Sequence, residues 1–80
     1  MYALDEYHAE MQRVDKRCAE FQIAGEWLSV TDAAKIIGCT RQTARNNIRF
    51  GGTNNKPQIT RSQLARQLAE MGQYRVKEPS

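Results

Sequence analysis

The chain has 80 residues and a mass of 9.2 kDa, and 40% of its residues are hydrophobic while 26% are charged. A chain of this length forms one domain with a small core, which excludes a doubly wound sheet or a barrel enzyme. Its formal net charge of +3 is unevenly distributed, because residues 1–28 carry −3 and residues 29–80 carry +6. No acidic residue lies between Asp32 and Glu70, and this basic stretch favours a polyanionic partner such as nucleic acid.

The sequence offers no set of residues suited to catalysis or metal binding. It has two cysteines, Cys18 and Cys39, and a single histidine, His8, whereas a structural zinc site needs four ligands that are mostly Cys and His. Both cysteines fall at apolar positions and are expected to be buried, reduced thiols. We therefore expect a protein that is not an enzyme and that has no cofactor and no metal.

The sequence also lacks targeting and membrane signals. It contains no run of eighteen apolar residues, so no membrane span is expected. The segment from Met1 to Glu6 is acidic and lacks the basic and then apolar pattern of a signal peptide. We therefore expect a cytoplasmic location.

The first predicted element is a helix from Tyr2 to about Ala24, because this segment contains neither Gly nor Pro and Gly25 follows it. Its larger apolar residues recur at steps of three and four, as at the a and d positions of a heptad: Leu4, Tyr7, Met11, Val14, Cys18 and Phe21. We expect this seam to pack against a second copy and form a homodimer. Packing on the rest of the same chain is the alternative.

Trp27 follows this helix in the sequence and is expected to anchor the core between this helix and the next.

A second predicted helix covers about Val30 to Ile37. Ser29 and Asp32 have the spacing of a capping box, in which each side chain accepts a hydrogen bond from the other residue's backbone amide. Gly38 can adopt the left-handed conformation that ends a helix.

A third helix is predicted from Arg41 to Phe50, with Thr40 as its N-cap and Gly51–Gly52 after its end. At 100° per residue, Ala44 lies on the face toward the core. The opposite face is wholly polar and consists of Gln42, Arg45, Asn46 and Arg49.

The segment 51–58 is rich in turn-forming residues, and both a short hairpin and a plain loop remain open for it. Thr60 and Gln63 form a second capping-box pattern, which predicts a helix over residues 61–71 that Gly72 terminates. Residues 73–80 are predicted to be a flexible tail.

The turn Gly38–Cys39–Thr40 is expected to join the second and third helices into a helix-turn-helix. The pattern A-A-x-x-x-G-x-[ST]-x-x-T, which starts at Ala33, resembles the helix-turn-helix of phage excisionase-type and MerR-type DNA-binding domains. The resemblance runs from Leu28 to about Leu68. It implies a winged helix-turn-helix that binds double-stranded DNA.

The predicted DNA-binding set combines the third helix with the segment that follows it. Its members are Thr40, Arg41, Gln42, Arg45, Asn46, Arg49, Lys56 and Arg61. Gln42, Arg45 and Asn46 are expected to contact base edges, since Arg pairs with guanine and Gln or Asn pairs with adenine. Thr40 and Arg49 are expected to contact phosphates.

The predicted fold is all-α, with or without a minimal β wing. Residues 1–25 form the heptad helix for oligomerisation or packing, residues 26–72 the DNA-binding domain, and residues 73–80 the tail. The expected function is sequence-specific DNA binding, as a small transcriptional regulator or an excisionase-like factor of a phage or mobile element. The alternative is an oligomeric assembly or adaptor protein, such as a small-terminase-like DNA-packaging component, in which a ring of copies would replace the dimer.

Overall fold

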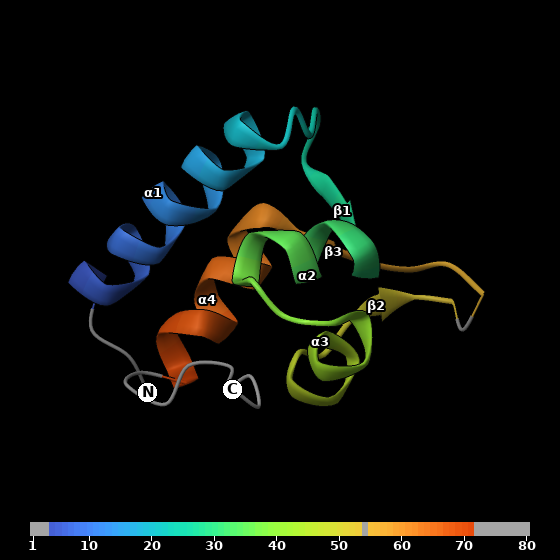
Figure 1. Cartoon of the computed structure of the whole chain (residues 1–80). Helices are drawn as coiled ribbons and strands as arrows, with labels where there is room; N and C mark the ends of the chain where they lie inside the picture. The colour runs from blue at the N-terminus through green and yellow to red at the C-terminus, as the bar shows by residue number, and fades with distance from the viewer. Residues whose placement is uncertain (1–3, 54, 72–80) are drawn as a thin grey trace.

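A computed structural model describes residues 4–53 and 55–71, which fold into four helices and a three-stranded sheet (Figure 1). In chain order the elements are α1 (Leu4–Glu20), β1 (Trp27–Ser29), α2 (Val30–Ile37), α3 (Arg41–Asn47), β2 (Gly51–Gly52), β3 (Pro57–Thr60) and α4 (Arg61–Met71). The chain is therefore mainly helical, as predicted, but its β part is a three-stranded sheet that includes β1 and is larger than the minimal wing considered from the sequence. Within these ranges no helix combines the length and the apolar character needed to cross a bilayer.

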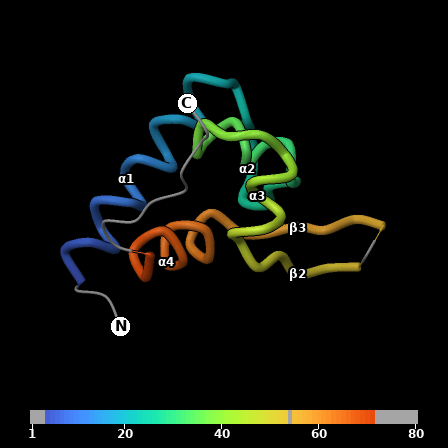
Figure 2. Tube along the Cα trace, turned by 60° about the horizontal axis from the view of Figure 1, so that its bottom comes forward, coloured from blue at the N-terminus to red at the C-terminus, as the bar shows by residue number. Residues whose placement is uncertain are grey.

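The sheet is antiparallel with the strand order β1-β3-β2. Leu28 pairs with Ile59 across β1 and β3, and Gly51 pairs with Gln58 across β2 and β3. The strands β2 and β3 thus form a hairpin, which decides between the two alternatives for this segment. The hairpin extends away from α1 and α4 (Figures 1 and 2). The strand β1, which the sequence did not predict, ties the hairpin to the start of α2.

One core joins α1, β1, α2, β3 and α4 around the fully buried Leu28, Ile59 and Leu64. A second, smaller cluster of Val30, Ala34 and Ala44 lies between α2 and α3. The small cluster packs α3 against α2. The main core packs α2, through Ala33 and Ile36, against the rest of the chain.

The centre of the predicted heptad seam packs on its own chain. Val14 and Cys18 are buried in the main core, Met11 packs against it, and α1 runs beside α4 (Figures 1 and 2). Only the two ends of the seam are open, with Leu4 66% and Phe21 41% exposed. The helix that covers the seam is therefore α4. A homodimer through α1 stays a prediction, and its contacts would have to come from these ends.

The helix α1 ends at Glu20, earlier than predicted, and Gly25 does not end it. Gln22 adopts the left-handed conformation with φ 57°. The amide of Ile23 donates to the Cys18 carbonyl at 2.8 Å, which is the capping pattern that usually contains a glycine. The cap turns Ile23 toward the core, where it is partly buried.

Trp27 is not the core anchor that the sequence suggested, since it is 57% exposed. It lies on β1, where successive side chains point to opposite faces of the sheet. Leu28 takes the inward position and is fully buried, so the strand geometry directs Trp27 outward.

The predicted bounds and caps of α2 are confirmed. The Ser29 hydroxyl accepts from the Asp32 amide at 3.1 Å, and the Asp32 carboxylate accepts from the Ser29 amide at 3.4 Å. Gly38 is left-handed with φ 89°. The reciprocal pair Thr60–Gln63 caps α4 in the same way at 3.2 and 3.3 Å. Gly72 and the predicted tail lie outside the described residues.

The helix α3 ends at Asn47 and does not continue to Phe50. Ile48 is extended, with φ −113° and ψ 135°, and is buried in the main core. The side-chain amide of Asn47 donates to the Thr43 carbonyl at 2.8 Å and closes the last turn. Because the backbone is extended at Ile48, Arg49 follows α3 instead of belonging to its exposed face.

Candidate functional site

The turn between α2 and α3 is built by small residues. The amides of Gly38 and Cys39 both donate to the Ala34 carbonyl, at 2.8 and 3.0 Å. Ala34 and Ala44 are 4% and 0% exposed, so the two helices approach closely at their contact. Cys39 packs against the same small cluster. Ala44 faces the core as predicted, whereas the expected burial of both cysteines holds for Cys18 and not for Cys39, which is only partly buried. This packing leaves the opposite face of α3 in solvent.

This outer face of α3 carries four exposed polar side chains: Arg41, Gln42, Arg45 and Asn46. Gln42 Nε2 donates to Asn46 Oδ1 at 3.3 Å, so the two amides form a pair one helical turn apart. Thr40 caps the start of the helix, because its hydroxyl accepts from the Thr43 amide at 3.1 Å. The face holds two guanidinium groups and two amides, all of which can donate hydrogen bonds to nucleic acid.

A groove of about 460 Å³ separates α3 from the hairpin. Arg41 and Arg45 line it from α3, and Lys56 lines it from the hairpin. The start of α2 contributes the third wall. Among the described residues that line the groove there is no Asp or Glu, so three cations from two elements line one space without a carboxylate from that part of the chain. Such a groove attracts an extended anion.

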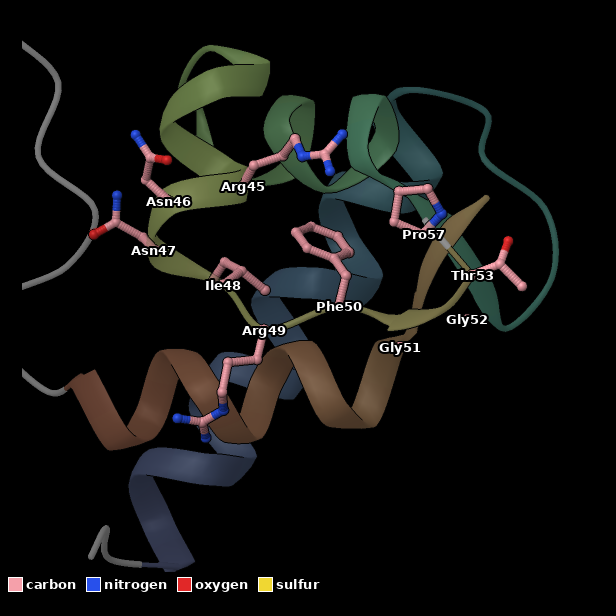
Figure 3. Close-up of a pocket in the computed structure, with 10 residues that line it drawn as sticks. All are labelled: Arg45, Asn46, Asn47, Ile48, Arg49, Phe50, Gly51, Gly52, Thr53 and Pro57. Carbon is pink, nitrogen blue, oxygen red and sulfur yellow. The ribbon is translucent and has the colours of Figure 1, made fainter. Parts of the chain in front are cut away.

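A second hollow of about 430 Å³ adjoins the first and continues it past the end of α3. Arg45 and Pro57 line both spaces, and Phe50 lines the second. In Figure 3 the Arg45 side chain extends above the Phe50 ring toward Pro57, whereas Asn46 points away from the hairpin. Arg45 therefore stands at the boundary between the outer face of α3 and the hairpin.

The hairpin holds Lys56 in place through its backbone. The Lys56 amide donates to the carbonyl and to the hydroxyl oxygen of Thr53, at 3.2 and 3.1 Å. Gly52 has φ 83°, and a Cβ atom built there would lie 2.5 Å from the Lys56 carbonyl oxygen. Glycine is thus required at this position for the turn to close.

Arg49 follows the end of α3 and does not share its outer face, but it lines the second hollow together with Arg45 and Asn46. Its side chain is 82% exposed, extends along α4, and lies 3.5 Å from the Glu70 carboxylate (Figure 3). Its backbone is held by Gln67, whose amide accepts from the Arg49 N–H and donates to the Arg49 carbonyl, both at 2.8 Å. Gln67 therefore fixes the chain between α3 and β2, a role that no sequence pattern indicated.

Arg61 is also absent from the groove, because the chain itself uses its guanidinium group. Nε and Nη2 donate to the carbonyls of Gly25 and Ile23, at 2.8 and 3.1 Å. Nη1 lies 3.3 Å from Asp15 Oδ1, and the side chain is only 20% exposed. Arg61 therefore links α4 to α1 and to the connection before β1, and it is not among the residues that line the groove beside α3.

Sequence reasoning missed groove residues that depend on the hairpin register: Asn55, Pro57 and Gln58. Gln58 pairs with Gly51 and precedes the buried Ile59, so the strand alternation turns it outward. Once the hairpin register is known, this alternation identifies Gln58 as a groove residue.

Comparisons with protein-family models, with curated proteins and with solved structures return no match for this chain. Any function is therefore argued from the residues and their arrangement.

Proposed function

We propose that the chain binds double-stranded DNA in a sequence-specific manner, as a small transcriptional regulator or an excisionase-like factor. The helices α2 and α3 act as a helix-turn-helix, with α3 as the recognition helix. One observation carries the proposal: the polar outer face of α3 continues into a groove that Arg41, Arg45 and Lys56 line, with no carboxylate among its described lining residues. The surface combines base-reading side chains with phosphate-attracting charge.

The dimensions suit the major groove. An α-helix with its side chains is about 10–12 Å across, and the major groove of B-DNA is about 12 Å wide. With α3 in that groove, Arg45 can donate two hydrogen bonds to guanine O6 and N7, and an amide side chain such as that of Gln42 can pair with adenine. These side chains are exposed on a helix whose other face is anchored by Ala44.

The hairpin supplies contacts to the DNA backbone. A phosphate strand at the edge of the major groove would run along the space between α3 and the hairpin, which Arg41 lines from α3 and Lys56 from the hairpin. Such contacts set the orientation of α3 and carry no sequence information. Arg61 is left out of this set, because its guanidinium group binds backbone carbonyls of the chain itself. Arg49 lines the adjoining hollow and stays a proposed phosphate contact.

Selection from a random duplex library, followed by sequencing, tests the proposal. An enriched palindrome would support a symmetric regulator, and an enriched single or tandem site would support an excisionase-like factor. Absence of enrichment with folded protein would contradict the proposal and favour the assembly or adaptor alternative.

Variants then test the site. Arg45→Ala should weaken binding to the selected site by about 1–3 kcal/mol and relax the preference at one base pair. Arg66→Ala is the matched control, because Arg66 is an exposed arginine on α4 outside both hollows. Equal effects of the two substitutions on the selected site would contradict the assignment of α3.

A further inference from the structure

We propose that Gln42 and Asn46 read one adenine as a unit, in which Gln42 contacts the base and Asn46 orients the Gln42 amide. The inference rests on the proposed DNA binding and adds the base that this part of α3 recognises. Asn46 is thus a positioning residue for Gln42, and it does not contact a second base independently.

The geometry that carries the inference is the hydrogen bond between the two amides. Both residues are exposed and lie four positions apart on α3, and Gln42 Nε2 donates to Asn46 Oδ1 at 3.3 Å. A glutamine amide has two N–H donors and one carbonyl oxygen. The bond to Asn46 uses one donor, so the oxygen and the second N–H of Gln42 remain for a ligand.

The remaining pair of groups is complementary to adenine. In the major groove adenine presents the N6 amino group as a donor beside N7 as an acceptor. Gln42 Oε1 can accept from N6 while the second N–H on Nε2 donates to N7. An isolated glutamine side chain must lose rotational freedom when it makes these two bonds. The bond to Asn46 orients the Gln42 amide before DNA binds and directs Nε2 toward Asn46. One orientation of the Gln42 oxygen and of its second N–H toward the base is therefore favoured.

The rest of α3 does not compete for this bond. Arg45 lies between the two residues in sequence but points over Phe50 toward the hairpin (Figure 3). Asn47 is committed to the Thr43 carbonyl at 2.8 Å. Gln42 and Asn46 therefore form a separate pair on the outer face.

The test is the same library selection, carried out with the unaltered protein and with Gln42→Ala, Asn46→Ala and Asn46→Asp. The unaltered protein should prefer adenine at one position by about tenfold over the other bases. Gln42→Ala and Asn46→Ala should both reduce this preference to about twofold or less, at that same position. Gln12→Ala, at an exposed glutamine of α1, is the control and should leave the preference unchanged.

Asn46→Asp separates positioning from direct base contact. Aspartate keeps an oxygen that can accept from Gln42 Nε2, so the adenine preference should survive while the added negative charge weakens binding to all sequences alike. An aspartate that touched a base directly would instead create a preference for cytosine at a second position. That outcome would overturn the inference.

Three further outcomes would also overturn it. Loss of preference at two different positions in the Gln42 and Asn46 variants would show independent contacts. A selected site without any adenine requirement would refute the inference while leaving the proposed DNA binding intact. If the unaltered protein selects no sequence at all, the proposed function fails and the inference fails with it.

Circular dichroism checks that each variant is folded. Asn46→Met, which also lacks the amide oxygen, replaces Asn46→Ala if that variant unfolds.

Discussion

At the scale of single residues, Gly52 determines the shape of the hairpin. Gly52→Ala should cost about 1–2 kcal/mol for the left-handed conformation alone, and the Cβ atom would also press against the Lys56 carbonyl oxygen at 2.5 Å. Displacement of Lys56 should then weaken DNA binding several-fold.

The neighbouring glycine offers a matched control. A Cβ atom at Gly51 would meet the Gln58 carbonyl at 3.6 Å, an ordinary contact, so Gly51→Ala should change stability by less than about 1 kcal/mol. Thermal unfolding and DNA titration of both variants measure the difference. Similar losses for the two substitutions would contradict the assigned role of Gly52.

Burial of Cys18 makes stability depend on pH in the alkaline range. Desolvation raises the pKa of the Cys18 thiol above its ordinary value of 9.0, while the positive charge of Arg61 opposes that rise. The folded state therefore holds the thiol proton more tightly than the unfolded chain. The contribution of this thiol to the free energy of unfolding is therefore complete below about pH 9. It decreases above that pH, because the thiol of the unfolded chain ionises first.

The variant Cys18→Ala isolates this effect. It should be less stable than the parent at neutral pH, because a buried side chain is shortened, but this difference should shrink between about pH 8 and pH 10. Chemical denaturation at several pH values measures it. Parallel stability curves for the two proteins would show that the thiol does not contribute.

At the scale of elements, Arg61 holds α1, the β1 connection and α4 together. Arg61→Ala removes two bonds to backbone carbonyls and the contact with Asp15. We expect a loss of about 1.5–3 kcal/mol in the free energy of unfolding and unchanged DNA affinity of the folded protein. Arg66→Ala should change stability by less than about 0.5 kcal/mol. Weaker DNA binding with full stability would restore Arg61 to the DNA-contacting set.

At the scale of the whole molecule, the packing of α1 on α4 determines what the heptad seam does. Met11 packs against the shared core. Met11→Glu should therefore lower the free energy of unfolding by about 1–3 kcal/mol, because it places a charge among apolar side chains. Gln12→Glu adds the same charge at the adjacent exposed position and is the control. A mass halved in light scattering, with the melting temperature unchanged, would instead show that the seam joins two copies.

Local sequence determined those elements whose ends are set by neighbouring residues. The helix α2 has its predicted bounds because Ser29, Asp32 and Gly38 supply both caps within the segment itself. The helix α4 starts as predicted because Thr60 and Gln63 cap it in the same way. The turn between α2 and α3 and the polar outer face of α3 follow from the same kind of short-range information, so most of the candidate site was visible in the sequence.

Only the tertiary structure decided the rest, because it depends on contacts between segments distant in sequence. After α3, Ile48 is extended and buried in the main core among residues from other elements. Trp27 points outward because Leu28 occupies the inward position of β1, opposite Ile59. Arg61 carries the same charge as the groove cations, but its backbone partners lie 36 and 38 positions earlier in the chain. Charge and helical periodicity identify a basic, amphipathic segment, whereas the choice of partner for each face depends on which surfaces the fold brings together.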